Sequence, residues 1–216
     1  CARAERCSDP RIETVDGKIR RLPALTPRPL CEPDRTLLFQ TINQTPATYV
    51  DLYRALPRLN GTGPKVSGSK SPPLPLRADV EALMREMNHI TTTWAEIVSA
   101  VAGLSADQPK RHGPAIQQAC DILTRRLDAL LALDTWPVAR YFSLKAASEL
   151  PPGTGGKVFP SAGYAVAIVH LDGAEAAEEI FSLHAKCRSM LGLTRKRETL
   201  NIPCEHCGRA AITRQE

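Results

Sequence analysis

The sequence lacks the features that mark a membrane or a secreted protein. Its longest apolar stretches fall well short of the roughly 18 residues that a membrane-spanning helix needs. No basic segment followed by an apolar one opens it, as a secretory signal would. Its seven cysteines are odd in number, and five of them gather at the two ends while two are isolated in helical segments, unlike a disulfide framework. We therefore expect a cytoplasmic protein whose cysteines serve metal sites.

The sequence also lacks a complete catalytic motif. Residues 151–157 resemble a phosphate-binding Walker A loop, but Val158 replaces the Ser or Thr that would bind Mg²⁺. His184 and Cys187 are spaced for one helix face and could form a nucleophile pair, yet packing in a helical bundle explains them more simply. Cys120 is assigned to packing for the same reason. We expect no enzyme activity and no small-molecule substrate.

Apolar residues recur at helical spacing through most of the chain. The strongest pattern runs from Val80 to Val101 and is expected to bury Trp94. Further helices are expected near residues 34–44, 45–57, 114–130, 138–148 and 172–191. Thr45-Pro46 reads as a helix start, because threonine is a good N-cap and proline a good first residue. The apolar run 165–171 is not assigned by its spacing.

These patterns predict a mainly α fold, a helical bundle with small zinc-binding cysteine-rich ends. Strands are expected at the ends alone, including a hairpin around Asp16-Gly17. We divide the chain into an N-terminal zinc-binding region with helices (1–59), a flexible Gly/Ser/Pro-rich linker (60–75), the bundle (76–192) and a partial zinc ribbon (193–216).

Cys1, Cys7, Cys31 and Asp34 are candidate metal ligands near the start of the chain. A ligand pair three residues apart at the start of a helix, here Cys31 and Asp34, is how treble-clef zinc folds supply half of their site. Asp is a less common but permissible Zn²⁺ ligand. The alternative interpretation is three free thiols in a frayed end.

A second candidate site lies near the other end, where Cys204 and Cys207 flank Glu205-His206 and precede a glycine. A Cys-x-x-Cys-Gly turn presents two thiolates on one tight loop, but a closed Zn²⁺ site needs four ligands. The missing pair could lie on a second knuckle beyond residue 216. Cys7 and Cys31 could also supply it, because chain ends often lie close in space. We favour the first arrangement.

The net charge of +5 is spread along the chain and does not by itself indicate nucleic-acid binding. Basic residues are concentrated around the Cys204 pair, however. Guanidinium groups suit phosphate, so the candidate nucleic-acid contacts are Arg195, Lys196, Arg197 and Arg209. A solvated basic tail is the alternative.

The order of elements resembles uncharacterised helical zinc-binding proteins of actinobacteria and their phages. The matching pieces are Leu30-Cys31, the segment 49–56, the linker followed by Pro73-Leu-Pro-Leu-Arg77, the tryptophan-containing helix, the segment 183–192 and the knuckle 203–208. The departures are Asp34 in place of a cysteine and the absent second knuckle.

The resemblance implies a zinc-binding protein encoded by a phage or prophage and located in the host cytoplasm. It carries no activity that can be transferred to this chain. We expect it to contact nucleic acid or the transcription machinery. The alternative is a protein–protein adaptor or inhibitor of a host complex, with purely structural zinc.

Overall fold

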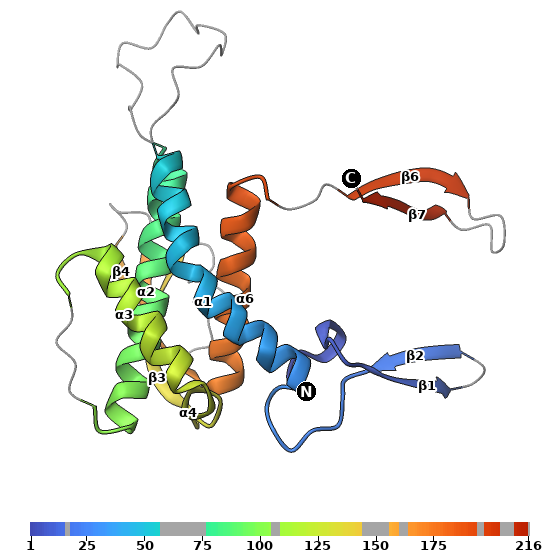
Figure 1. Ribbon diagram of the computed structural model, residues 1–216, viewed down its shortest axis with the longest axis horizontal. Coiled ribbons are helices and arrows are strands. Elements are labelled where there is room, and N and C mark those ends of the chain that lie inside the picture. Colours follow the sequence, from blue (N-terminus) through green and yellow to red (C-terminus); the bar gives the residue numbers. More distant parts are fainter. Residues whose placement is uncertain are drawn as a thin grey trace, which may run out of the picture.

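The computed structural model describes residues 1–15, 18–56, 77–104, 109–143, 156–159, 164–193, 197–203 and 210–215. The expected linker 60–75 lies outside these residues. The protein is mainly helical, as predicted (Figure 1). Its helices are η1 (Ala4–Arg6), α1 (Glu32–Ala55), α2 (Ala78–Val101), α3 (His112–Arg125), α4 (Leu127–Leu131) and α6 (Gly173–Met190). Its strands are β1 (Arg11–Val15), β2 (Lys18–Leu22), β3 (Trp136–Ser143), β4 (Gly156–Phe159), β5 (Tyr164–Leu171), β6 (Arg197–Pro203) and β7 (Ala210–Gln215).

The core lies where α1, α2, α3 and α6 pack against one another. Helix α2 supplies the predicted apolar face, and Trp94 is fully buried within it. Helix α1 contributes Leu38, Ile42 and Leu52 to the same core, so the N-terminal region and the bundle share one apolar interior. Among the described helices, none combines the length and apolarity that crossing a lipid bilayer needs.

Helix α1 is continuous through Pro46, which corrects the helix start predicted at Thr45-Pro46. Proline removes the backbone donor that would bond the carbonyl four residues earlier. Buried apolar residues on both sides of this position hold the helix together, and the Thr45 hydroxyl bonds the Thr41 carbonyl at 2.9 Å. Tertiary packing therefore overrides a local signal that is typical of a helix start.

A three-stranded antiparallel sheet, in the order β3-β5-β4, corrects the expectation that strands occur at the ends alone. Strand β3 replaces the helix predicted over 138–148, and the unassigned run 165–171 is β5. Along β5, Ala165 and Ala167 are buried while Ile168 is exposed, the alternation of a sheet with one covered face. The hairpin expected around residues 16 and 17 is confirmed by the antiparallel pairing of β1 with β2.

One buried ion pair connects the sheet to two helices. Arg140 on β3 places Nε and Nη2 at 2.7 and 2.6 Å from the two carboxylate oxygens of Glu179 on α6. The indole Nε1–H of Trp94 on α2 donates to the same carboxylate at 2.8 Å. A bidentate ion pair of this kind fixes the relative orientation of the two side chains as well as their distance. It therefore sets where the sheet lies against the bundle.

Helix α6 starts at a closely packed turn. The Asp172 carboxylate accepts from the backbone N–H of Glu175, and the Glu175 side chain accepts from the N–H of Asp172, a reciprocal capping box. Gly173 follows, where a Cβ would collide with the backbone carbonyl of Leu130. This close approach joins α6 to α4 and explains the glycine.

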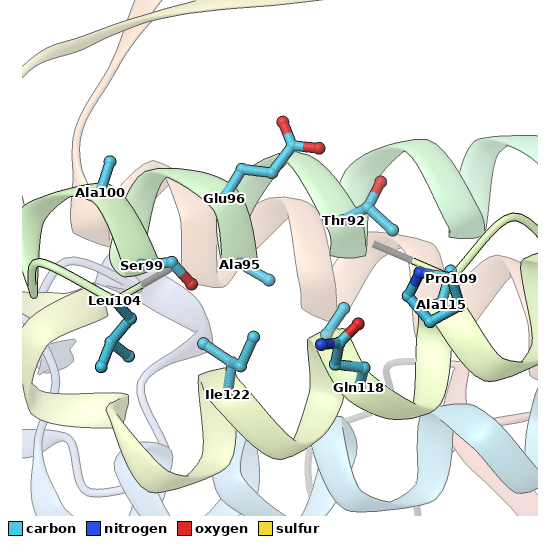
Figure 2. Close-up of a pocket in the computed structure, with 11 residues that line it drawn as sticks. Thr92, Ala95, Glu96, Ser99, Ala100, Leu104, Pro109, Ala115, Gln118 and Ile122 are labelled. Carbon is cyan, nitrogen blue, oxygen red and sulfur yellow. The ribbon is translucent and has the colours of Figure 1, made fainter. Parts of the chain in front are cut away.

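Helices α2 and α3 meet through small side chains, Ala95 from α2 and Ala115 and Ala119 from α3 (Figure 2). A space of about 190 Å³ remains between them. Ser99 borders it, and its buried hydroxyl has no hydrogen-bond partner within the described part of the chain. By contrast, the Thr91 hydroxyl on the same helix bonds the carbonyl four residues earlier at 2.8 Å.

Candidate metal centre

The fold brings together four residues that the sequence singled out. One ligand atom from each of Cys1, Cys7, Cys31 and Asp34 lies within 4.8 Å of the others. Cys7, Cys31 and Asp34 are buried and Cys1 is half-buried. The other two candidate ligands, Cys204 and Cys207, belong to the connection between β6 and β7 and lie outside the described residues. This cluster of three thiols and one carboxylate could therefore hold a metal ion.

The start of α1 positions half of the cluster. Cys31 is the N-cap residue of this helix, and Asp34 follows within its first turn. Glu32-Pro33 between them suits a helix start, because proline is favoured in the first turn. The N-terminus of a helix carries partial positive charge, which stabilises thiolates and carboxylates. The sequence thus places two residues that bind metals as anions at the helix end that carries partial positive charge.

The other two ligands come from the first residues of the chain, which fold back onto the segment before α1. The backbone N–H of Ala2 donates to the Pro29 carbonyl at 2.7 Å. The short helix η1 then turns the chain, and Cys7 follows it with its N–H bonded to the Ala4 carbonyl at 3.1 Å. Its Sγ lies 3.7 Å from Sγ of Cys31. The two segments meet at the cluster.

Asp34 is fully buried and uses its two carboxylate oxygens for different partners. Oδ2 accepts hydrogen bonds from the thiols of Cys1 at 3.2 Å and Cys31 at 3.1 Å, and from the backbone N–H of Ser8 at 3.1 Å. Oδ1 accepts from Ser8 Oγ at 2.5 Å and from Arg3 Nη1 at 2.7 Å. One oxygen therefore points toward the sulfur atoms, while the other is held by groups behind it.

Arg3 extends this arrangement to α6. Its Nε donates to Glu178 at 3.0 Å, and its guanidinium lies 4.2 Å from the ring centroid of Phe181. Arg6 reaches the same Glu178 carboxylate at 3.2 Å. Outer contacts of this kind orient metal ligands in proteins and tune their basicity. The cluster is thereby linked to α6 as well as to α1.

The surroundings act on the two helix ligands in opposite directions. Burial raises the pKa of Asp34, but hydrogen bonds from Ser8, Cys31 and Arg3 outweigh it and leave the pKa below its usual value. Burial and the neighbouring Asp34 raise the pKa of the Cys31 thiol. The carboxylate is therefore held as an anion, whereas a bound cation would be needed to favour the Cys31 thiolate.

The remaining described thiols are packed in the core, as predicted. Burial raises the pKa of both Cys120 and Cys187 to about 12. Such thiols are poor nucleophiles near neutral pH. His184, one turn before Cys187, is half-buried, and burial together with Arg188 lowers its pKa.

The candidate nucleic-acid contacts are largely outside the described residues. Arg195, Lys196 and Arg209 fall there, while Arg197 is the first residue of β6. Strands β6 and β7 pair antiparallel, and one of them precedes the cysteine pair in the sequence while the other follows it.

Sequence reasoning missed the groups that surround the metal ligands. Arg3 lies between the first two cysteines and Ser8 directly follows the second, positions that could have drawn attention to them. Glu178 lies on a helix face, a position typical of solvated charges, and nothing in the sequence connects it with Arg3, 175 positions earlier.

Comparisons with protein-family models, with curated proteins and with solved structures find no match to this chain.

Proposed function

We propose that Cys1, Cys7, Cys31 and Asp34 bind one structural Zn²⁺ ion that fastens the start of the chain to the helical bundle. The observation that carries the proposal is the convergence of four donor atoms within 4.8 Å of one another. Three thiolates and one carboxylate are ligand types that Zn²⁺ accepts in closed sites.

The spacing of the donors supports zinc. With Zn–S bonds near 2.3 Å and Zn–O bonds near 2.0 Å, a tetrahedral site has S···S edges of about 3.8 Å and S···O edges of about 3.5 Å. The Cys7 and Cys31 sulfurs are 3.7 Å apart, and the two thiols on Asp34 Oδ2 lie at 3.1 and 3.2 Å. The S···S distance is that of a tetrahedral edge, whereas the two S···O distances are those of S–H···O hydrogen bonds. A [4Fe–4S] cluster would separate the cysteines further, since each of them binds a different iron.

Burial favours a structural role. A catalytic zinc site keeps a position open for water or substrate, whereas a structural site is closed by four protein ligands. Here Cys7 is 3% exposed, Cys31 4% and Asp34 0%. The ion would join two segments of the chain at the base of α1, and Arg3 would transmit this constraint to α6.

Metal content and folding test the proposal. The Cys204→Ser/Cys207→Ser double variant removes the second cysteine pair, so any bound zinc reports on the cluster. We expect about one equivalent of zinc under reducing conditions and partial loss of folded structure when a chelator removes it. Cys31→Ser should abolish binding, and Cys120→Ser should not. Less than a few tenths of an equivalent of zinc would refute the proposal.

We further propose that the basic residues around the second cysteine pair contact nucleic acid or the transcription machinery. Their charge concentration supports this, together with a Cys-x-x-Cys segment between two paired strands. Replacing Arg195, Lys196 and Arg197 by Gln should flatten the salt dependence of duplex binding by up to about three contacts, each worth a log–log slope near −0.9. Affinity should fall equally for all sequences. An absence of salt-sensitive binding in the unmodified protein would favour the adaptor role.

A further inference from the structure

A groove of about 1070 Å³ lies between α2 and the β3-β5-β4 sheet, remote in sequence from the metal ligands. Helix α2 forms one wall, and residues of β3, β5 and α6 form the other. The volume is at the upper end of the few hundred to about 1000 Å³ that ligand sites occupy. Apolar side chains with a few convergent polar groups are also usual in such sites. We propose that this groove binds a neutral, planar nitrogen heterocycle that donates N–H hydrogen bonds.

The charges around the groove favour a neutral ligand. Four charged side chains line it, two basic and two acidic: Arg85, Arg140, Glu86 and Glu179. Each is paired within the protein, because Arg140 binds Glu179, Arg85 binds Glu81 at 2.5 Å and Glu86 binds Lys186 at 2.6 Å. A phosphate or carboxylate would have to break one of these pairs or enter beside a carboxylate. The groove therefore favours neutral ligands over anions.

An aromatic pair favours a planar ligand. The rings of His89 and Tyr141 pack edge to face, with centroids 5.0 Å apart at 71°. Both side chains line the groove, together with the apolar Ile90, Val169 and Leu171. A flat ring can stack on an aromatic side chain while the aliphatic groups exclude water from its edges.

Two hydrogen-bond acceptors favour a ligand with N–H groups. Nε2 of His89 lies 3.0 Å from the Ala139 carbonyl. A carbonyl only accepts, so Nε2 donates to it, and Nδ1 is the ring nitrogen left to accept a hydrogen bond. The neighbouring Asn88 also lines this region, and its buried Oδ1 has no hydrogen-bond partner within the described ranges. A donor from the ligand would relieve the cost of that unpaired oxygen.

The test uses the 216-residue chain with labelled methyl groups and three probes: indole, adenine and toluene. The methyl resonances of Ile90, Val169 and Leu171 should shift saturably with indole or adenine. The methyl of Ile116, buried in the core on α3, should stay in place. Toluene has the ring without an N–H and should bind about tenfold more weakly than indole or not at all.

His89→Phe is the matched variant, since it keeps a ring against Tyr141 and removes the acceptor. It should weaken indole or adenine binding about tenfold and leave toluene binding unchanged. A second variant, Leu171→Trp, should fill the groove and weaken all three probes. Adenosine monophosphate should bind more weakly than adenine, because its phosphate meets the paired carboxylates. An absence of saturable shifts in the unmodified protein, or equal indole affinity in His89→Phe, would overturn the proposal.

Discussion

Arg3 holds Asp34 from the side opposite the thiols: Nη1 lies 2.7 Å from Oδ1, while the sulfur contacts are made by Oδ2. The Arg3 side chain is 12% exposed and that of Asp34 is fully buried. A cation in this position fixes the carboxylate that would ligate the metal and offsets part of the negative charge of three thiolates and a carboxylate.

Arg3→Gln should therefore lower zinc affinity about 10- to 100-fold, the usual effect of losing a group that orients a ligand. Competition with a chromophoric chelator measures this. Arg6→Gln is the control, because Arg6 is 71% exposed and contacts Glu178 without reaching Asp34. Equal losses in both variants would mean that general positive charge matters, and not the contact with the carboxylate.

Trp94 packs its ring in the apolar core and donates its indole N–H to Glu179, which is ion-paired with Arg140 of the sheet. Trp94→Ala should cost about 3–5 kcal/mol of unfolding free energy through the cavity it leaves. Trp94→Phe keeps most of the ring but loses the N–H that donates to Glu179, and should cost about 1–3 kcal/mol. Chemical denaturation measures both values.

The emission of Trp94 gives an independent check on its burial. In a Trp136→Phe variant, Trp94 is the one tryptophan left and should emit at the short wavelengths typical of buried indole, because it has no exposed surface. Emission at the wavelength of indole in water would contradict its placement.

The sequence predicted the helices that depend on interactions between residues close in the chain, and it missed a strand that depends on distant ones. The helical spacing of apolar residues in α2 and α6 is local, and both helices were predicted from it. Strand β3 was misread as a helix because its pairing with β5 joins residues more than twenty positions apart. The buried face of that sheet is made by Val138, two alanines and an ion-paired arginine, and in this set only the valine carries a strong strand signal.

The candidate metal site was predicted from a spacing that is local at Cys31 and Asp34. Cys1 and Cys7 were also predicted as ligands, but the side chains that surround the four ligands were not. Glu178 and Phe181 reach it from the far end of the chain, and Ser8 contributes a backbone N–H as well as its hydroxyl. Such contacts are set by packing, which a single sequence does not display.

His184 should make the stability of the fold sensitive to mild acid. Its folded-state pKa lies below the usual value, chiefly because burial disfavours the charged ring. The unfolded chain therefore binds the proton more readily, so the histidine leaves stability intact above about pH 6.5 and lowers it as the pH falls from there. His184→Gln should remove this part of the pH dependence, measured as the difference between the two unfolding curves at pH 7.5 and roughly pH 5.5. An unchanged difference would contradict the prediction.

Ser99 should be replaceable by alanine without loss of stability. Its buried hydroxyl lacks a hydrogen-bond partner among the described residues, so Ser99→Ala removes a desolvated polar atom and should raise the unfolding free energy by up to about 1 kcal/mol. Thr91→Val is the comparison, because that hydroxyl does bond and its removal should not stabilise. Thermal unfolding of the two variants decides between them. A destabilised Ser99→Ala would mean that the hydroxyl has a partner.

X-ray absorption at the zinc edge tests the central claim most directly. The Cys204→Ser/Cys207→Ser variant should be used, so that the signal comes from the N-terminal cluster alone. We predict about three sulfur neighbours near 2.3 Å and one oxygen near 2.0 Å. In Asp34→Cys the oxygen shell should be replaced by a fourth sulfur. A first shell dominated by oxygen or nitrogen, or one unchanged by Asp34→Cys, would contradict the assignment of these four residues as the zinc ligands.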